Sequence, residues 1–270
     1  TLGYQLLPYL RTEAPKTTFV DLCHTEEMHW LNGGHPRFGV GYQDALDMNV
    51  VSTRHLSEWM AERNADPAKI RVMYTGIKSH PVSLSQAQRA EMQRGFGLDE
   101  HALTIIFAGR MCNQKRPLKL AEILHALKQA GVRFNALIIG EGELRPAFED
   151  LIRQYDLGAD VHVVGAKPHA EWLSLLAISD VLLMPSEYEG ISVALLESMA
   201  AGVVPVVADV GGQDELVGEE TGYLIPHGED EVNHYVGVLQ TLSIDAPMRE
   251  RKAQACQELI EAHYTAAATN

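Results

Sequence analysis

From about residue 100 onward, short apolar runs rich in β-branched residues alternate with amphipathic stretches, and this alternation restricts the fold more than any other feature. The runs lie at 104–108, 135–139, 161–164, 181–184 and 203–208. Uninterrupted apolar runs of this kind indicate strands that helices cover on both faces. Between the first two runs, apolar residues repeat at helical spacing from Pro117 to Gly131. The pattern therefore predicts a complete doubly wound α/β domain around a parallel sheet.

A shorter series of similar patterns precedes this domain. Strands are predicted at 18–22, 49–52 and 70–74, and a helix at 53–63. Residues 76–85 contain Gly, Pro and three Ser without periodicity, which indicates an interdomain linker. Three strands are fewer than the roughly five of a usual sheet, so we expect a truncated N-terminal α/β domain. The expected parts are 1–77 from the N-terminal domain, 78–247 as a Rossmann-like domain, and 248–270 as a terminal helix and tail.

The charge balance limits the classes of partner. The chain has 22 basic and 36 acidic residues and a formal net charge of −14. Nucleic acids and anionic membrane surfaces are bound through broad positive potential, so both are poor candidates, and an anionic ligand must be bound by local charge. No stretch approaches the roughly 18 apolar residues of a membrane span. The three cysteines are far apart, which suggests neither disulfides nor a zinc site. We therefore expect a cytoplasmic protein.

Ligands of open α/β sheets bind outside the carboxyl ends of the strands, so residues that follow the strands are candidates for function. Gly109 and Arg110 follow the run at 104–108, and Lys115-Arg116-Pro117 then begin the predicted helix. Three cations beside a helix N-terminus, whose free N–H groups also favour anions, would form a phosphate site. The alternative is that Arg110 and Lys115 are solvated surface charges, and the spacing alone favours neither.

A second strand end combines a turn with two acids. After the run at 181–184, Gly190 marks a strand-to-helix turn, and we expect the helix to begin at Ile191 or Ser192. Glu189 would lie at the mouth of a crevice and Glu197 almost two turns inside the helix. Two such carboxylates can accept hydrogen bonds from the hydroxyls of a sugar or a ribose. Glu197 could instead be an exposed helix carboxylate, but its apolar neighbours indicate the packed side, where an acid needs a partner.

Two other chemistries receive little support. Gly140 and Gly142 follow the run at 135–139, but a dinucleotide fingerprint would require Gly or Ala where the chain has Arg145. We interpret Gly142 instead as a point of close backbone approach. His24 and His29 are five residues apart, whereas the metal motif H-E-x-x-H places two histidines four apart on one helix face. We therefore predict no metal site.

Four motifs in this order resemble glycosyltransferase family 4, a family of retaining enzymes with the GT-B fold. They are Gly109-Arg110 followed after four residues by Lys115, Gly140-x-Gly142, Glu189-Gly190 with seven residues before Glu197, and the segment 201–207 with Gly211-Gly212. The resemblance covers residues 78 to about 245, and the segments at 20–24, 51–52 and 70–76 resemble the last strands of the family's N-terminal domain. It implies an acceptor-side domain before the linker and a nucleotide-sugar-binding domain after it.

The resemblance also implies a role for each matching residue. Arg110 and Lys115 would bind the donor's diphosphate and stabilise the negative charge that grows there as the glycosidic bond breaks. Glu189 would bind the sugar hydroxyls and Glu197 the ribose hydroxyls, while main-chain groups of 165–168 would hold the nucleobase. His24 matches a histidine near the transferred sugar, or else caps or packs at a strand end. The expected catalytic residues are Arg110, Lys115, Glu189 and His24, and the expected donor-binding residues are Gly109, Gly142, Gly165, Lys167, Gly190, Ile191, Ser192, Val193 and Glu197.

The function that this resemblance implies is transfer of a hexosyl-type sugar from a nucleoside diphosphate sugar to a hydroxyl of a glycan, lipid or small molecule, with retained configuration. No metal or other cofactor is expected, because the two cations and a helix N-terminus can neutralise the diphosphate. The leaving phosphate would help to deprotonate the acceptor, so the carboxylates would bind rather than act as a glycosidase pair. Two alternatives stay open: a GT-B nucleotide-sugar epimerase, which needs no acceptor, and a non-catalytic nucleotide- or glycan-binding module of a larger protein.

Overall fold

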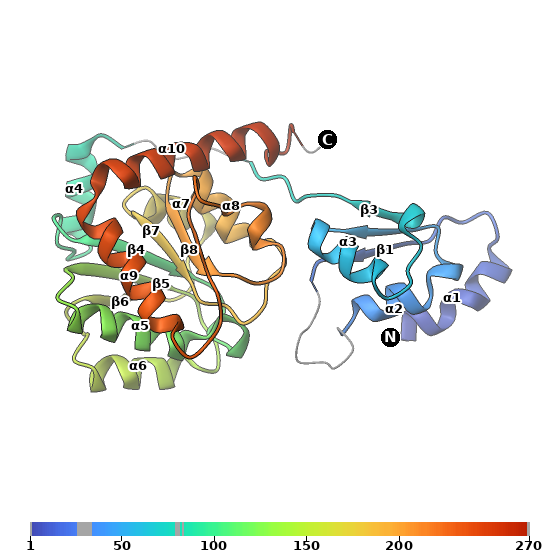
Figure 1. The fold of residues 1–270 in the computed structure, drawn as a ribbon, viewed down its shortest axis with the longest axis horizontal. Coiled ribbons are helices and arrows are strands. Elements are labelled where there is room, and N and C mark those ends of the chain that lie inside the picture. Colours follow the sequence, from blue (N-terminus) through green and yellow to red (C-terminus); the bar gives the residue numbers. More distant parts are fainter. Residues whose placement is uncertain (1, 26–33, 79–81, 83, 269–270) are drawn as a thin grey trace.

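The computed structural model describes residues 2–25, 34–78, 82 and 84–268, which form two α/β domains. An extended segment after the last strand of the smaller domain leads across to the larger one, and the C-terminal helix runs back toward the junction (Figure 1). A short parallel bridge between Ile77 and Thr265 joins the linker to the residues that follow this helix. The Ile77 N–H donates to the Tyr264 carbonyl at 2.9 Å, which holds the linker against the end of that helix.

The smaller domain contains a three-stranded parallel sheet. Its strands are β1 (Val20–Cys23), β2 (Met48–Val51) and β3 (Ile70–Val72), in the order β1-β2-β3. The helices are α1 (Leu2–Glu13), α2 (Pro36–Gly41) and α3 (Arg54–Ala61), with 3-10 turns η1 (Gln43–Ala45) and η2 (Pro67–Lys69). The side chain of Thr53 accepts the Leu56 N–H at 2.9 Å and so begins α3. Apolar residues of α3, above all Leu56 and Met60, pack against the sheet.

The larger domain contains a six-stranded parallel sheet in the order β6-β5-β4-β7-β8-β9. The strands are β4 (Leu103–Ala108), β5 (Phe134–Ile139), β6 (Val161–Val163), β7 (Val181–Met184), β8 (Val204–Ala208) and β9 (Tyr223–Ile225). Strands β4, β5, β7 and β8 are almost fully buried, as their uninterrupted apolar runs predict. The chain moves outward from β4 to β6 and then returns to β7 beside β4, so the strand order reverses there.

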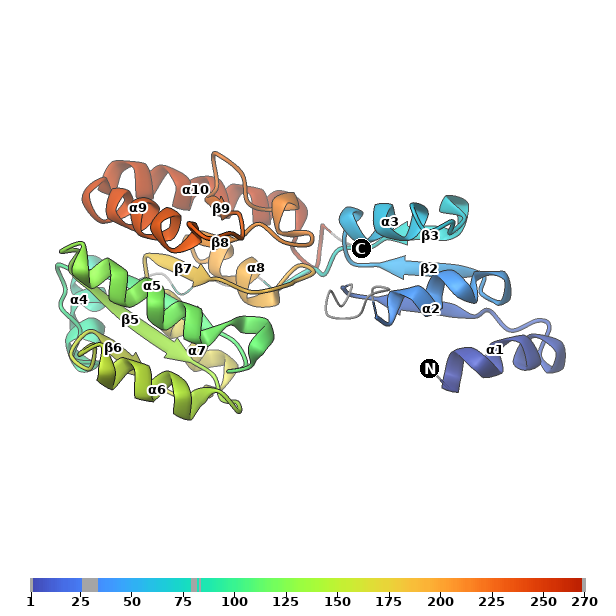
Figure 2. The same cartoon turned by 60° about the horizontal axis from the view of Figure 1, so that its bottom comes forward.

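Helices cover both faces of the larger sheet. They are α4 (Gln86–Gly95), α5 (Pro117–Gln129), α6 (Arg145–Gln154), α7 (His169–Leu176), α8 (Val193–Ala200), α9 (Glu231–Ile244) and α10 (Ala246–His263), with 3-10 turns η3 (Asn113–Lys115) and η4 (Gln213–Glu215). Helices α5, α6 and α9 pack in one apolar cluster, and α7, α8 and α10 pack in the other (Figure 2). The doubly wound α/β architecture is therefore confirmed. None of the helices in the described ranges has the length and apolar character that crossing a bilayer requires.

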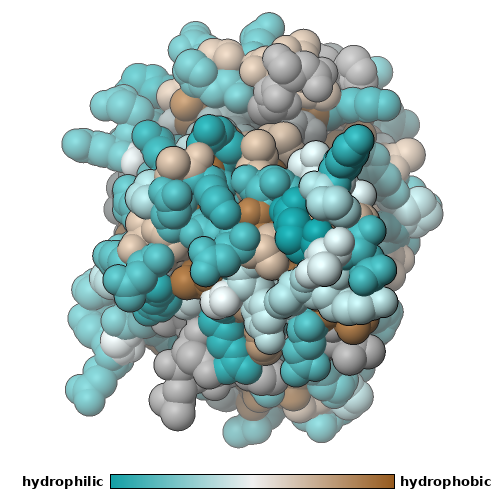
Figure 3. Space-filling model, turned by 90° about the vertical axis from the view of Figure 1, so that its right-hand side faces the viewer, coloured by the Kyte–Doolittle hydropathy of each residue, from teal (hydrophilic) through white to brown (hydrophobic). Residues whose placement is uncertain are grey.

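The boundaries of the predicted strands agree with the structure to within a few residues, but several elements were not predicted. Strand β9 was not predicted, because only Tyr223, Leu224 and Ile225 form it between polar loops. Helix α1 also lacked a recognised signal; it contains Pro8, and its outward-facing Tyr9 is 62% exposed. Hydrophilic side chains cover most of the end of the molecule that the smaller domain forms, with only small separate apolar areas (Figure 3).

Candidate functional site

The candidate site lies where the strand order reverses, at the carboxyl ends of β4 and β7. Gly109 and Arg110 follow β4, and the loop from Pro185 to Ser192 connects β7 to α8. Helix α8 begins at Val193, with Ser192 as the extended residue before it, one residue later than the latest start that the sequence predicted. The Ser192 hydroxyl makes no capping hydrogen bond, so the first N–H groups of α8 have no side-chain cap.

The main contact across this edge joins Lys115 to Glu189. The Lys115 ammonium forms an ion pair with the Glu189 carboxylate, and the Glu189 residue is only 6% exposed. The alkyl chain of Lys115 lies on Gly109, where an added Cβ atom would come within 3.2 Å of two carbons of the lysine side chain. Two hydrogen bonds of Gln114 fix the two loops together. Its carbonyl accepts the Glu187 N–H at 2.7 Å, and its side-chain amide donates to the Tyr188 carbonyl at 3.1 Å. The fold therefore brings these two predicted residues into direct contact.

The other two predicted cations behave differently. Arg110 is exposed, and no polar partner of its guanidinium is found among the residues that the structure describes. Arg116 turns away in a left-handed conformation, with φ of 48°, and its guanidinium pairs with Glu187 and with buried Glu231. Burial acts to raise the pKa of Glu231, but the hydrogen bond and charge of Arg116 outweigh it and lower that pKa. Arg116 is thus part of an internal ion pair and not of the predicted anion site.

Glu197 lies inside α8 on the packed side, as its apolar neighbours indicated. Its Oε2 accepts the indole N–H of Trp172 at 2.6 Å, and its Oε1 lies 2.7 Å from His169 Nε2. Trp172 is 7% exposed, whereas the His169 side chain is 64% exposed. Sequence reasoning missed both residues, because neither lies in a motif and their spacing on α7 carries no signal for a partner on α8.

Glycines allow the loops of the site to approach one another closely. A Cβ on Gly142 would collide with the Met111 carbonyl, which confirms the interpretation of this residue as a close backbone approach. Gly165 has φ of 71°, in the left-handed region, and lies against the carboxylate of Glu141. The neighbouring Lys167, in the loop before α7, pairs with Glu171 in the first turn of α7 at 3.4 Å. These loops line the same edge of the sheet as β4 and β7.

His24 lies at the carboxyl end of β1, where the smaller domain meets the site. Its carbonyl accepts the Ser52 hydroxyl at 2.7 Å, and a Cβ on Gly190 would collide with the same carbonyl oxygen. The backbone of β1 thus reaches the turn between Glu189 and α8. His29 lies outside the described residues, and no group of three or more potential metal-binding side chains occurs within the described part of the chain.

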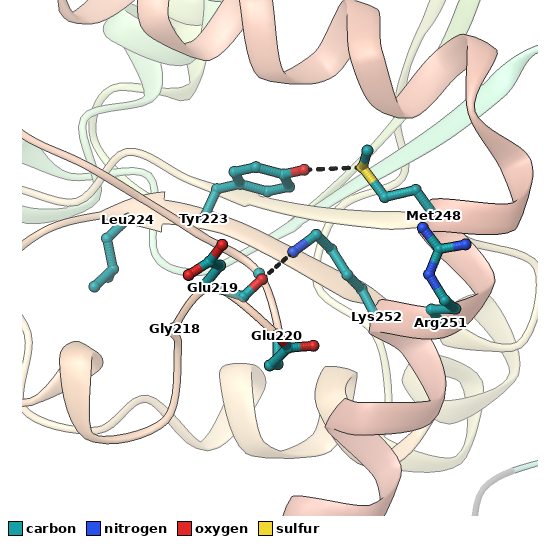
Figure 4. Close-up of a pocket in the computed structure, with 9 residues that line it drawn as sticks. Gly218, Glu219, Glu220, Tyr223, Leu224, Met248, Arg251 and Lys252 are labelled. Atoms are coloured by element: carbon teal, nitrogen blue, oxygen red, sulfur yellow. Dashed lines mark hydrogen bonds between the residues drawn. The ribbon is translucent and has the colours of Figure 1, made fainter.

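A separate pocket of about 500 Å³ lies at the opposite edge of the larger sheet, between the amino end of β9 and α10 (Figure 4). The Lys252 ammonium donates to the Glu219 carbonyl and lies 4.6 Å from the centre of the Tyr223 ring. The Tyr223 hydroxyl donates to the Met248 sulfur at 3.2 Å. These polar groups therefore bond to one another, away from the predicted donor residues.

Residues 88–258, more than half of the chain, match the profile of the family described as "Glycosyl transferases group 1". The chain belongs to this family. An uncharacterized glycosyltransferase of Methanocaldococcus jannaschii is 30% identical over 175 residues, which cover 63% of this chain and 44% of that protein. Alpha-D-kanosaminyltransferase of Streptomyces kanamyceticus is 28% identical over 199 residues, which cover 73% of this chain and 51% of that protein. The chain therefore spans about half the length of these relatives.

Solved structures show the same architecture along the whole chain. The structure of Anabaena Alr3699/HepE in complex with UDP matches with a TM-score of 0.85 at 16% identity, covering 99% of this chain and 74% of that one. Sucrose-phosphate synthase from Thermosynechococcus elongatus matches with a TM-score of 0.81 at 20% identity, covering 99% and 69%. At such identities the likeness concerns the fold alone, and that fold is the GT-B type.

Proposed function

We propose that this group 1 glycosyltransferase is a family 4 enzyme that transfers a hexosyl group from a nucleoside diphosphate sugar to an acceptor hydroxyl with retention. The observation that carries the proposal is the meeting of Lys115, Glu189 and the N-terminus of α8 at the point where the strand order reverses. Ligands of open α/β sheets bind at this point.

Binding of the diphosphate would use local positive charge in an acidic chain. Arg110 is exposed at the end of β4, and the first N–H groups of α8 lack a side-chain cap. Both favour an anion, and the charge on the diphosphate increases as the bond to the sugar breaks. Lys115 would then exchange its contact with Glu189 for one with a phosphate oxygen, which frees Glu189 to accept a hydroxyl of the donor sugar. No metal ion is required for this neutralisation.

Binding of the ribose would use Glu197, because Trp172 fixes its carboxylate. The indole N–H holds Oε2, while Oε1 contacts an exposed histidine that can rotate away. A ribose hydroxyl could take the place of His169 at Oε1 without leaving a buried polar group unpaired. UDP is the natural first ligand to test, because the HepE structure with a similar fold contains UDP.

The donor proposal is tested by calorimetric titration of UDP, GDP and ADP into the chain, together with an Arg110→Ala variant. Hydrogen bonds to charged groups contribute about 1.5–3 kcal/mol, so we expect the variant to bind at least tenfold more weakly. Arg153→Ala is the matched control, since Arg153 is an exposed arginine of α6 whose partner is Asp150. Equal affinity in the Arg110→Ala variant, or no binding of any nucleoside diphosphate, would contradict the proposal.

The reaction itself is tested by product analysis with a nucleotide sugar, in the presence and absence of candidate acceptors. Sugar transfer with retained configuration supports the proposal. Conversion of the donor to an isomer without an acceptor would identify an epimerase instead. Nucleotide binding without turnover in any longer polypeptide that contains this chain would identify a binding module.

A further inference from the structure

The carboxylate of Glu215 on η4 binds groups of the smaller domain and of the segment that leaves it. Its Oε1 accepts the backbone N–H of His55 at 3.1 Å, and its Oε2 accepts the Tyr74 hydroxyl at 2.5 Å. The Arg54 guanidinium lies 3.3 Å from Oε2. Arg54 and His55 form the first turn of α3 in the smaller domain, and Tyr74 lies in the crossing segment after β3. Glu215 itself belongs to the larger domain, and its side chain is only 6% exposed.

This carboxylate lies where a helix accepts negative charge. The first N–H groups of α3 have no partner within the helix, and its positive end favours an acid. Thr53 accepts the Leu56 N–H from within the smaller domain, and Glu215 accepts the preceding N–H, that of His55, from the other domain. Burial, followed by the hydrogen bond to Glu215, raises the pKa of Tyr74, so its hydroxyl keeps the proton that it donates.

The contacts of Glu215 lie beside a cavity at the junction of the two domains. A cavity of about 610 Å³ adjoins it, lined by Val72 and by Leu259 and His263 of α10. Domains of one chain move relative to each other unless a large apolar interface joins them. Here a polar contact set beside a cavity connects them, and the Tyr264 hydroxyl adds a 3.3 Å hydrogen bond to the Glu215 carbonyl.

The contact set is also connected to the candidate site through the backbone that precedes it. A Cβ on Gly211 would collide with the Glu189 carbonyl, and a Cβ on Gly212 would lie 2.8 Å from the Thr53 Cβ. The loop that carries Glu215 thus runs between the acid of the site and the cap of α3. Displacement of α3 would also displace β1, whose end reaches Gly190 through the His24 carbonyl.

We propose that Glu215, with Arg54, His55 and Tyr74, forms an interdomain clamp that positions the end of β1 and His24 against the turn at Gly190. Glu215 is a positioning residue in this arrangement, because it contacts none of the predicted donor-binding side chains. The clamp stands apart from nucleotide binding, since the predicted donor-binding residues all lie in the larger domain, whereas His24 is a predicted catalytic residue of the smaller one.

The clamp is tested with Glu215→Ala and Glu215→Gln variants of the whole chain. Spin labels on Glu62→Cys and Glu229→Cys report the distance between the domains, since both positions are exposed and the three native cysteines are buried. Hydrogen exchange at the His55 amide reports the hydrogen bond itself. We expect Glu215→Ala to broaden the distance distribution and to speed His55 exchange by roughly tenfold, because a cap and a buried hydrogen bond are lost. Glu215→Gln keeps a hydrogen-bond acceptor, so its distance distribution and its His55 exchange rate should lie between those of the parent and of Glu215→Ala.

Asp214→Asn is the matched control, since Asp214 is the exposed acid that precedes Glu215 on the same turn. It should leave both readouts unchanged. If Glu215→Ala does not fold, Tyr74→Phe removes one hydrogen bond to the carboxylate and should broaden the distribution more modestly. An unchanged distribution and unchanged His55 exchange in a folded Glu215→Ala variant would overturn the clamp. UDP titration of the parent and of these variants distinguishes failure of the clamp from failure of the proposed function. If none of these proteins binds UDP, the donor proposal is contradicted and the clamp is not.

Discussion

The Lys115 ammonium is paired with the Glu189 carboxylate, so a cation from the loop after β4 neutralises an acid from the loop after β7. Both groups are largely removed from solvent, with side-chain exposures of 15% and 7%. A buried ion pair that is broken leaves an uncompensated charge, which is costly unless a ligand replaces the lost partner. A diphosphate and a sugar hydroxyl are together suited to replace both partners.

Lys115→Met should therefore weaken UDP binding by about 1.5–3 kcal/mol, or roughly tenfold to a hundredfold, because a charged donor to phosphate is lost. Glu189→Gln should leave UDP binding equal or tighter, because the acid that competes for the ammonium is neutral in that variant. It should, however, remove any preference for a UDP-sugar over UDP. Calorimetric titration measures both affinities, and weaker UDP binding by Glu189→Gln would contradict the exchange of partners.

Trp172→Phe should lower the affinity for UDP several-fold while the fold is retained. The phenyl ring keeps most of the buried apolar area, but Glu197 loses the N–H that holds Oε2 at 2.6 Å. A hydrogen bond to a charged group contributes about 1.5–3 kcal/mol, and only the part that orients Glu197 is lost from ligand binding. Trp59→Phe on α3 is the matched control, because this indole lies under the Arg63 guanidinium in the other domain. If both variants bind UDP like the parent, Trp172 does not orient Glu197 for the ligand.

Glu231→Gln should destabilise the larger domain by about 3 kcal/mol, because Arg116 keeps its charge while its buried partner loses its own. The lowered pKa of Glu231 sets the pH dependence. A depressed carboxyl pKa adds stability above the usual value near 4.5, and that stability is lost as the pH falls through the folded-state pKa. Urea unfolding at pH 7 and pH 4 should show a smaller difference between variant and parent at pH 4. Glu229→Gln, at an exposed position, should have the same free energy of unfolding as the parent at both pH values.

His162 should make the chain less stable as the pH falls below about 6.5. Burial lowers the pKa of this histidine, and the charge of Asp160 partly opposes the shift. Its Nε2 is buried and has no hydrogen-bond partner among the residues that the structure describes. The unfolded chain therefore binds the proton more readily than the folded chain, and stability rises with pH through this window. Denaturant unfolding between pH 5.5 and 7.5 should give a shallower slope for His162→Gln than for the parent. His101→Gln, at an exposed histidine, should keep the parent slope, and an equal slope for both variants would refute the assignment.

Much of the larger domain follows from local sequence patterns. Buried parallel strands need uninterrupted apolar runs, and the runs at 104–108 and 181–184 coincide with β4 and β7. Because the strands are parallel, the residues that follow each strand lie at the same edge of the sheet. The neighbourhood of Lys115 and Glu189 could therefore be predicted without coordinates. The need of the half-buried Glu197 for a partner was likewise evident from its apolar neighbours.

The identity of partners was decided only by tertiary packing. Arg116 and Lys115 are adjacent in the sequence and equally basic, yet a left-handed backbone at Arg116 directs one toward Glu231 and leaves the other at Glu189. Trp172 and Glu215 carry no local signal, because their partners lie 25 or more residues away. Local patterns determine which face of a strand or helix is buried, whereas side-chain partners depend on how elements distant in the chain pack together.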